Sequence, residues 1–478
     1  MIISSFNDVV RYLNGSYTKK QDYGKLPDPL LHIEREKYLL SLFDHPENSF
    51  KAIHIAGSKG KGTTAAYTAG LLRGYSDKIG LYLSPHVFSY KERWSFVDFF
   101  TRGIRYFSDE AYIKCAIAME EKLGDHTALT DLPGNVPPSP FELYTLFAAL
   151  LFRQENIELA VIETGIGGRC DATNVFNSIA SVITHIEKEH AEILGRSLEE
   201  ITREKCGIIK PNTPTFTYTQ SDEVMNVIKE EASAKNSELI IAEVNTKVKN
   251  FAKTSLMRGE AAKNDLALAI KVAEHIKGSK ILSPITDIKL PCRGELIIDE
   301  NCAYILDGAH TKDSIANAIK NFSTVLKKAD FDEYVKHQDF NEDEISSLIE
   351  MFDEISMKRS MSECIAIFAC SKNKDVEGMA EELLKTFKTI YITELEDKNK
   401  AMRITDELIA FEKAQNKMDK VKTKQLIPQN SLDACLNHIH HSNGEEYPVY
   451  VAILGSFYLC GEFRDDASRV FLHGIKGN

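Results

Sequence analysis

Short apolar segments alternate with longer helix-like stretches along the first half of this chain. Five of the apolar segments have the length and composition of strands, and they occupy residues 52–56, 80–83, 159–163, 181–186 and 239–242. Helical patterns lie between several of them. Because this alternation is typical of parallel strands joined by crossover helices, it predicts a doubly wound α/β sheet. Ligand-binding residues are then expected at the carboxyl ends of the strands, where open sheets of this kind bind ligands.

A second α/β unit is predicted after the proline-bounded segment 284–291. Strand-like segments recur at 303–306, 364–369, 389–392 and 449–454, and most are followed by a loop and helical material. We place the boundary near residue 287, which gives a first domain of residues 1–287 and a smaller C-terminal α/β domain of residues 288–478. Two charged stretches that are poor in apolar residues, 330–359 and 394–424, are predicted to be surface helices of the second domain with solvated charges.

A loop rich in glycine and lysine directly follows the first predicted strand and precedes a helix-like run over residues 65–72. It reads Gly57-Ser58-Lys59-Gly60-Lys61-Gly62-Thr63-Thr64. Glycines let the backbone turn tightly with its N–H groups pointing inward, and both the helix N-terminus and Lys61 add positive charge. The loop is therefore predicted to bind the phosphates of a nucleotide. A simple turn between a strand and a helix is the alternative interpretation.

The spacing of this loop departs from the common phosphate-binding pattern G-x-x-x-x-G-K-[ST]. That pattern requires a glycine where this chain has Ile55 and a hydroxyl residue where it has Gly62. The loop instead satisfies a shorter pattern, G-x-x-G-K-G-[ST].

Composition and charge limit the classes of protein to which the chain can belong. Its 478 residues, 43% of them hydrophobic, allow two or three domains with separate cores. No apolar stretch is long enough to span a bilayer and residues 1–20 lack the pattern of a secretory signal, so a cytoplasmic protein is expected. The net charge of −12 argues against a general nucleic-acid or membrane surface. An anionic ligand must therefore meet a local cluster of basic groups.

Nine cysteines are scattered along the chain without a C-x-x-C pair. Neither a zinc site nor a disulfide framework is indicated by this spacing and odd total. The thiols are expected to be reduced and mostly buried.

A carboxylate at the end of a predicted strand is the second candidate for chemistry. Glu163 ends the apolar run 159–163 and is followed by a glycine-rich turn that contains Gly165, Gly167 and Gly168. At this edge of the sheet Glu163 can reach a metal ion bound at the phosphate loop, because magnesium is held by few protein oxygens and mostly by phosphate and water. A purely structural glutamate is the alternative.

Two further residues follow the predicted strand 181–186. His190 lies just past it and is expected on the same sheet edge as Glu163; taken alone, it would more often be a hydrogen-bonded structural histidine. Lys205 lies at the end of a helical pattern that Gly207 and Pro211 terminate. Taken alone, Lys205 is an ordinary last-turn lysine that interacts with the helix C-terminus.

Taken together, these segments resemble the folylpolyglutamate synthases and dihydrofolate synthases, a branch of the Mur ligase superfamily. The resemblance extends from about residue 51 to residue 464 and includes the shortened loop spacing. The matching segments are, in order, 57–64, 84–86, 141–142, 163–174, 190 with 193–195, 204–205 with 207–211, 307–310, 371–375 and 454–462.

The resemblance implies an ATP- and magnesium-dependent ligase. ATP would phosphorylate a carboxylate of a folate, the amine of L-glutamate would attack the acyl phosphate, and phosphate would leave as the amide forms. Whether dihydropteroate is also an acceptor of glutamate stays open. The implied partners are small molecules, with neither nucleic acid nor membrane, and a monomer is expected.

The family's site residues carry over by position. The loop 57–64 would bind ATP, with Lys61 on its phosphates, and a magnesium ion would be held by the positions of Ser84, Glu163 and His190. The counterpart of Lys205 is carbamylated in many members and then binds a second magnesium ion, which requires a lysine that can lose its proton. Further nucleotide contacts are implied for Asn264, Arg293, Asp307 and His310, and folate contacts for Ser84, Pro85, His86 and Phe141.

The chain departs from the family pattern at several of these places. Glu189 replaces the usual Asp before the metal histidine, Cys292 replaces the glycine before Arg293, and Thr311 replaces the Asn after His310. Residues 95–103 replace an Ile-Asn-Gly continuation that borders the folate site, and the segment 259–263 before Asn264 lacks the usual His-Gln element.

Two rival functions are also considered. A peptidoglycan-type Mur ligase usually has Thr or Ser directly after the loop lysine, where this chain has Gly62. A nucleotide-binding protein without ligase activity would have little use for the metal-binding set of Ser84, Glu163, His190 and Lys205.

Overall fold

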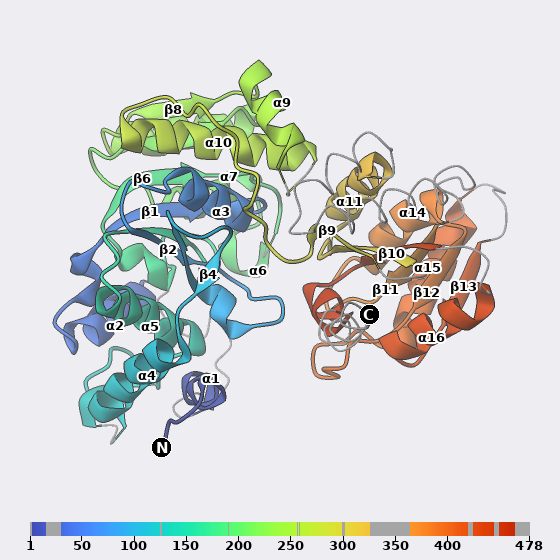
Figure 1. The fold of residues 1–478 in the computed structure, drawn as a ribbon, viewed down its shortest axis with the longest axis horizontal. Helices are drawn as coiled ribbons and strands as arrows, with labels where there is room; N and C mark the ends of the chain where they lie inside the picture. Colours follow the sequence, from blue (N-terminus) through green and yellow to red (C-terminus); the bar gives the residue numbers. More distant parts are fainter. Residues whose placement is uncertain are drawn as a thin grey trace. The chain divides into compact units, whose positions relative to one another are not determined.

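The structure is a computed structural model that describes residues 2–15, 30–124, 127–189, 191–255, 257, 259–298, 302–325, 364–418, 424–443 and 449–463. It divides into two compact units (Figure 1). The first unit contains Met1–Ala252 and Glu260–Ile288, and the second contains Lys253–Gly259 and Lys289–Asn478. The predicted boundary after residue 287 lies one residue before the end of the first unit, and the functional roles of the two domains stay predictions.

An eight-stranded sheet forms the centre of the first unit, in the order β4-β3-β2-β5-β1-β6-β7-β8. The six strands from β2 to β8 pair in parallel, whereas β3 and β4 add an antiparallel edge. The strands are β1 (Lys51–Ala56), β2 (Lys78–Tyr82), β3 (Trp94–Asp98), β4 (Arg105–Tyr106), β5 (Leu159–Glu163), β6 (Ser178–Ile183), β7 (Thr215–Tyr218) and β8 (Leu239–Ala242).

Helices cover both faces of this sheet, as expected for parallel strands that are buried on both sides (Figure 1). α3 (Lys61–Leu71) and α10 (Glu260–Lys277) pack against each other next to β1, β5, β7 and β8. The apolar core with α5 contains side chains of β1 and β5, including Ala52, Ala160 and Ile162. The other helices of this region are α1 (Phe6–Gly15), α2 (Leu31–Ser41), α4 (Asp109–Leu123), α5 (Pro140–Gln154), α6 (Ala191–Leu194), α7 (Leu198–Cys206), α8 (Asp222–Ala234) and α9 (Thr246–Lys253), with 3-10 turns at Pro46–Ser49, Tyr90–Arg93, Thr127–Leu129 and Ala172–Val175.

Local sequence signals explain where several of these helices begin. α5 starts with Pro140 at its first position, and a capping box joins Ser139 to Glu142. α7 starts with the equivalent box of Ser197 and Glu200. These boxes satisfy backbone N–H groups that the first helical turn leaves without partners.

A six-stranded sheet forms the second unit, in the order β13-β12-β11-β14-β10-β9. All neighbours are parallel except β9 and β10. Its apolar core joins strands β10, β11, β12 and β14 to α11, α14 and α15. The elements are β9 (Arg293–Ile298), β10 (Cys302–Asp307), α11 (Lys312–Val325), β11 (Ile365–Phe368), α14 (Val376–Thr386), β12 (Thr389–Ile392), α15 (Ile404–Lys417), β13 (Gln425–Pro428), α16 (Leu432–Asn443) and β14 (Val449–Leu454).

The predicted doubly wound α/β class is confirmed, and each of the nine predicted strands is present. Several predicted bounds are wrong by one to four residues, and two of these lie next to the loop. The helix after the loop begins at Lys61 instead of residue 65, and β6 ends at Ile183 instead of residue 186. β6 ends early because the backbone carbonyl of His185 accepts hydrogen bonds from the loop, at Ser58 N and Lys59 N.

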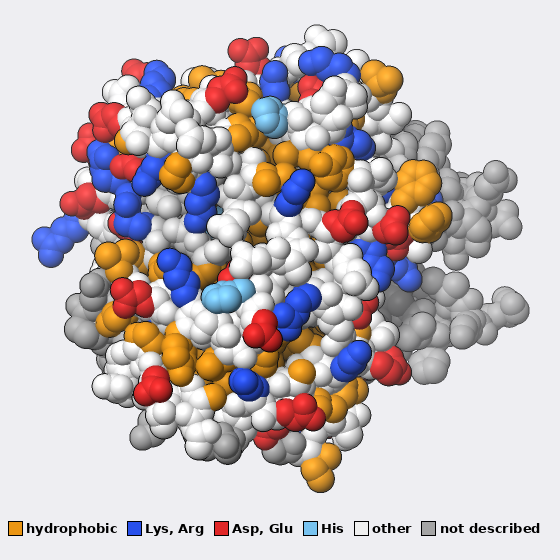
Figure 2. Space-filling model, turned by 90° about the vertical axis from the view of Figure 1, so that its left-hand side faces the viewer, with side chains coloured by type: hydrophobic (Ala, Val, Ile, Leu, Met, Phe, Trp, Pro, Cys, Tyr) orange, Lys and Arg blue, Asp and Glu red, His pale blue; other side chains and the backbone are white. Residues whose placement is uncertain are grey.

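The charged stretch 330–359 lies outside the described residues, and the stretch 394–424 contains α15. All nine cysteines are free thiols, and all but the half-buried Cys170 are buried, as predicted. Among the described residues no helix is long and apolar enough to cross a membrane. Figure 2 shows acidic and basic side chains interspersed on one face of the molecule.

Candidate functional site

The loop after β1 is held against the end of β6 by its own backbone. Ser58 N and Lys59 N donate to the carbonyl oxygen of His185 at 2.7 and 3.2 Å. A Cβ atom on Gly57 would lie 1.8 Å from Thr184 Oγ1, so only glycine fits this contact. Gly60 has φ +86° and its Cβ would lie 2.3 Å from Asp265 Oδ1 on α10. The two glycines are therefore required by close approach, and at Gly60 also by the left-handed backbone.

The same loop has the features of an anion-binding site. Gly60 is the N-cap of α3, so the first N–H groups of this helix have no intrahelical acceptors. The Lys61 ammonium donates to the carbonyl oxygen of Gly57 at 3.0 Å, which places the cation over the loop. The buried hydroxyl of Thr64 has no hydrogen-bond partner in the described part of the chain. These groups can hold and neutralise a phosphate.

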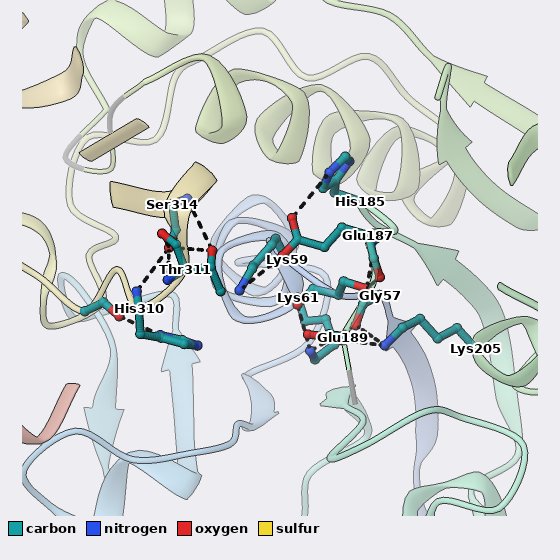
Figure 3. A network of polar contacts seen from close by, with 12 residues as sticks. Gly57, Lys59, Lys61, His185, Glu187, Glu189, Lys205, His310, Thr311 and Ser314 are labelled. Atoms are coloured by element: carbon teal, nitrogen blue, oxygen red, sulfur yellow. Dashed lines mark hydrogen bonds and ion pairs between the residues drawn. The ribbon is translucent and has the colours of Figure 1, made fainter. Parts of the chain in front are cut away.

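A second lysine of the loop is paired with an acid. Lys59 Nζ lies 3.4 Å from Glu187 Oε1, and His185 Nε2 lies 3.8 Å from the other oxygen of the same carboxylate (Figure 3). The Ser58 hydroxyl also donates to the Glu187 carbonyl oxygen at 3.0 Å. The segment after β6 thus fixes one wall of the loop.

Glu163 and Ser84 lie together at the carboxyl edge of the sheet. Glu163 ends β5, is buried, and accepts a hydrogen bond from Ser84 N through Oε2 at 3.0 Å. β2, β5 and β1 are parallel neighbours, which brings their carboxyl ends, and the segments that follow them, to one edge. The strand-end rule predicted the place of Glu163, and the family resemblance implied that Ser84 belongs to the same site.

The predicted folate-contact residues lie on the same part of the first unit. A Cβ atom on Gly165 would lie 2.6 Å from the ring of Phe141, so that ring packs on the turn after Glu163. His86 accepts a hydrogen bond from Arg93 Nε at 2.9 Å and its ring lies 3.9 Å from the ring of Tyr90. Pro85 follows Ser84 directly.

His190 lies outside the described residues, so its predicted place beside Glu163 stays a prediction. Among the residues that are described, no group of three or more His, Cys, Asp or Glu side chains could hold a metal ion. Two oxygen ligands are expected for magnesium here, the Ser84 hydroxyl and the Glu163 carboxylate. These two residues are far apart in the sequence but lie next to each other in the structure.

Lys205 is buried beneath the loop rather than exposed at a helix end. Its side chain, on a residue only 1% exposed, donates to the Gly57 carbonyl oxygen at 2.9 Å and to Glu189 Oε1 at 2.8 Å (Figure 3). Burial and the nearby Lys61 ammonium lower the pKa of Lys205 to about 8, although Glu189 opposes the shift. The interpretation of Lys205 as an ordinary last-turn lysine is therefore wrong.

Glu189 is a residue whose importance the sequence did not reveal. Burial would raise its pKa, but the ammonium groups of Lys205 and Lys61 outweigh burial and lower it. Its carboxylate is therefore ionised beside two lysines. The available signal was its place next to His190, at the position of the family's aspartate.

In the second unit, three predicted nucleotide contacts gather at the end of β10. Arg293 lies opposite Asp307 in the β9–β10 pairing, and its guanidinium lies 4.2 Å from the centre of the Phe457 ring. Burial raises the pKa of Asp307 to about 6, although Arg293 opposes this. His310 lies 5.8 Å from the Phe457 ring, between ring centres, and its Nδ1 contacts the Gly308 carbonyl oxygen at 2.8 Å.

The structure explains two departures from the family pattern. Cys292 has φ +55°, the left-handed conformation that favours glycine, so the backbone shape of the family's glycine is kept. Thr311 accepts a hydrogen bond from Ser314 N at 3.3 Å at the start of α11, a capping role that an asparagine also fills.

Asn264 is half-buried on α10, directly before the Asp265 whose carboxylate lies beside Gly60. The helix that carries Asn264 is thereby close to the loop. Its contact with a nucleotide stays a prediction.

Comparisons with known proteins show which proteins this chain resembles. The Mur ligase middle domain family matches residues 119–282. A dihydrofolate synthase/folylpolyglutamate synthase of Bacillus subtilis is 31% identical over 59% of this chain and 70% of its own length. A folylpolyglutamate synthase of Arabidopsis thaliana is 29% identical over 60% of this chain, and the match spans only 54% of that relative.

The fold also matches solved structures. A Mycobacterium tuberculosis folylpolyglutamate synthase complexed with ADP has a TM-score of 0.72 at 20% identity, covering 96% of this chain and 97% of that one. At this level of sequence identity, the similarity shows that the two proteins share a fold.

Proposed function

This chain belongs to the folylpolyglutamate synthase and dihydrofolate synthase family of ATP-dependent ligases, and we propose that it joins L-glutamate to the carboxylate of a folate. ATP would phosphorylate the folate carboxylate, the glutamate amine would attack the acyl phosphate, and phosphate would leave as the amide forms. Phosphoryl transfer needs mainly positioning and neutralisation of charge. The residues of the loop are suited to both.

The observation that carries the proposal is the convergence of three charged side chains on the loop. Lys61 and Lys205 both donate to the Gly57 carbonyl oxygen, and Glu189 pairs with Lys205. A nucleotide-binding loop needs the first lysine. The second lysine, buried and with a lowered pKa, has no evident use in nucleotide binding alone.

Lys61 would hold the transferred phosphate and stabilise its developing charge. Ser84, Glu163 and His190 would hold a magnesium ion, which supplies charge neutralisation at the phosphates. The fit is supported by the hydrogen bond between Ser84 N and Glu163 and by the Thr64 hydroxyl, which has no hydrogen-bond partner among the residues that the structure describes. In the second unit, Arg293, Asp307 and His310 would contact the nucleotide.

We further propose that Lys205 is carbamylated and binds a second magnesium ion. The reaction with carbon dioxide needs a neutral amine, and the lowered pKa of Lys205 supports this. A carbamate would place negative charge beside Glu189, and a metal ion between the two would remove the repulsion. Intact-mass measurement in bicarbonate buffer should show a carbamate that Lys205→Ala lacks; bare lysine, with full activity in Lys205→Ala, would exclude it.

Product analysis tests the acceptor. The protein is incubated with ATP, magnesium, L-glutamate and either tetrahydrofolate or dihydropteroate, and the products are identified by mass. We expect one glutamyl residue to be added to tetrahydrofolate, and product from dihydropteroate would add dihydrofolate synthase activity. Absence of any glutamylated product in both reactions would refute the proposed function.

The protein is expected to act as a monomer on these small molecules. Its oligomeric state can be measured by light scattering on a sizing column. A stable dimer would contradict that part of the proposal.

A further inference from the structure

A buried arginine lies at the centre of a polar cluster in the first unit. Arg35 belongs to α2 and is only 1% exposed, although its side chain is always charged. Its guanidinium makes five hydrogen bonds, which is the number of N–H groups that an arginine side chain can donate. Because every N–H group is used and solvent does not reach the side chain, Arg35 cannot bind a ligand itself. Any effect that it has on a substrate passes through the groups that it holds.

Two of the five hydrogen bonds go to one carboxylate. Arg35 Nε donates to Glu142 Oε1 at 2.7 Å and Nη2 donates to Oε2 at 3.2 Å, which is the paired geometry in which arginine binds carboxylates most strongly. Burial would raise the pKa of Glu142, but hydrogen bonds from His32 and Arg35 and the charge of Arg35 lower it to about 2. Glu142 is therefore ionised and compensates the buried charge of Arg35.

The five hydrogen bonds of Arg35 together fix the place where α5 begins. Glu142 lies in the first turn of α5, and its Oε2 also accepts a hydrogen bond from Ser139 N at 2.6 Å in the capping box. The other three hydrogen bonds of Arg35 go to backbone carbonyl oxygens of the segment that leads into α5: Pro133 at 2.6 Å, Val136 at 3.1 Å and Pro137 at 3.0 Å. One side chain of α2 thus holds both the first turn of α5 and the segment before it.

Phe141, one of the predicted folate contacts, lies directly before Glu142 in this first turn. Its ring stacks on the ring of Tyr82 at the end of β2, with 6.3 Å between the ring centres and 25° between the ring planes. It also packs on the turn after Glu163, because a Cβ atom on Gly165 would lie 2.6 Å from the Phe141 ring. The position of this ring relative to the carboxyl edge of the sheet therefore depends on where α5 begins.

We propose that Arg35 is a positioning residue for folate binding, which holds the first turn of α5 so that Phe141 can contact the folate. The identity of the ligand rests on the function proposed above. Displacement of a substrate-holding group by about 1 Å can lower activity about 100-fold. A lysine at position 35 would keep the charge but would donate from a single nitrogen atom, so it could not keep both contacts with Glu142 and all three with the carbonyl oxygens.

Steady-state kinetics of Arg35→Lys tests the proposal. The KM for tetrahydrofolate should rise at least about tenfold, whereas the KM for ATP should stay as in the wild type, because none of the five hydrogen bonds of Arg35 goes to the phosphate loop. The matched control is Arg153→Ala. Arg153 lies about 18 Å from Phe141 along α5 and donates to the Phe43 carbonyl oxygen at 2.7 Å. Its loss should leave both KM values unchanged.

A double-variant comparison tests whether Arg35 acts through Phe141. Arg35→Lys and Phe141→Leu would then impair the same contact, so their effects on the KM for tetrahydrofolate should not be additive. We expect Arg35→Lys to raise this KM by a much smaller factor in the Phe141→Leu background than in the wild type. Equal factors in the two backgrounds would overturn the proposal.

A KM for tetrahydrofolate that is unchanged in Arg35→Lys, or that rises by the same factor as the KM for ATP, would also overturn it. Glu142→Gln serves as a second variant if circular dichroism shows that Arg35→Lys does not fold, and the same split between the two KM values is expected of it. If the wild type forms no glutamylated product, the proposed function fails, and titration calorimetry with tetrahydrofolate decides the role of Arg35 separately. Weaker binding by Arg35→Lys than by the wild type would support that role, whereas no binding, or equal binding to both proteins, would refute it.

Discussion

Lys61 and Lys205 approach the same carbonyl oxygen from different elements, and this contact defines the chemistry at the scale of single residues. Lys61 comes from the start of α3 and Lys205 from the end of α7. Two ammonium groups can lie near one oxygen because Glu189 pairs with Lys205. Burial also lowers the pKa of Lys205, which makes its ammonium form less favourable. A phosphate at the loop would relieve the remaining repulsion.

Substitution of Lys61 tests its role directly. Lys61→Ala should lower kcat by roughly 100- to 1,000-fold, the usual cost of removing one group that stabilises transition-state charge. Lys280→Ala is the control, because this lysine is exposed and pairs with Glu274 away from the loop. Comparable turnover in Lys61→Ala and the control would show that the loop does not hold the transferred phosphate.

Glu407 gives a pH dependence of stability. Burial, helped by Glu394, raises the pKa of Glu407 to about 8, and one of its buried oxygens has no partner among the described residues. The native state therefore holds a proton that the unfolded state has lost above about pH 4.5. The stability this provides is complete below pH 4.5 and is lost as pH rises towards 8.

Urea unfolding of wild type and Glu407→Gln at pH 5 and pH 8 measures this effect. The glutamine cannot titrate, so between the two pH values wild type should lose on the order of 3 kcal/mol more unfolding free energy than the variant. An equal loss in both proteins would mean that Glu407 titrates normally.

At the scale of elements, the loop depends on how closely α10 approaches it. Gly60 leaves room for Asp265 of α10, and its backbone is left-handed. Gly278, just past the end of α10, has a similar backbone with φ +63° but open space around it. A comparison of alanine substitutions at Gly60 and Gly278 therefore distinguishes the effect of backbone strain from the effect of steric crowding.

Gly60→Ala and Gly278→Ala should therefore behave differently. Both pay a strain of about 1 kcal/mol for a left-handed alanine, visible in urea unfolding. Only Gly60→Ala should also raise the KM for ATP, by at least about tenfold, because its methyl group displaces Asp265 and the loop. A normal KM for ATP in Gly60→Ala would show that the loop tolerates this displacement.

The sequence predicted the central parallel strands well because strands buried on both faces are continuous apolar runs. β5 and β12 were predicted to the residue. β7 was missed because Thr215 and Thr217 interrupt its apolar pattern, although the structure buries both hydroxyls in hydrogen bonds. The antiparallel strands β3, β4 and β9 and the edge strand β13 were also missed, because short strands at or near a sheet edge carry little pattern.

The candidate site was predictable where residues follow strand ends. Glu163 was placed at the carboxyl edge of the sheet by that rule, whereas Ser84 was assigned to the same site only through the family resemblance, and the structure joins the two by one hydrogen bond. The pairing of Lys205 with Glu189 was not predictable, since it depends on how α7 packs under the loop.

At the scale of the whole molecule, each unit has its own sheet and apolar core, and each contributes a part of the proposed chemistry. The first unit has the phosphate loop and the proposed magnesium ligands. The second has Arg293, Asp307 and His310. A ligase needs both sets of groups, whereas a simple nucleotide-binding protein needs only the first.

Phosphate release from ATP, measured with each substrate omitted in turn, tests the central claim most directly. With magnesium and ATP present, release should require a folate or dihydropteroate, and it should match the glutamylated product in amount when L-glutamate is added. Phosphate release that proceeds at the same rate without any folate or dihydropteroate would contradict the proposal that this protein ligates L-glutamate to a folate.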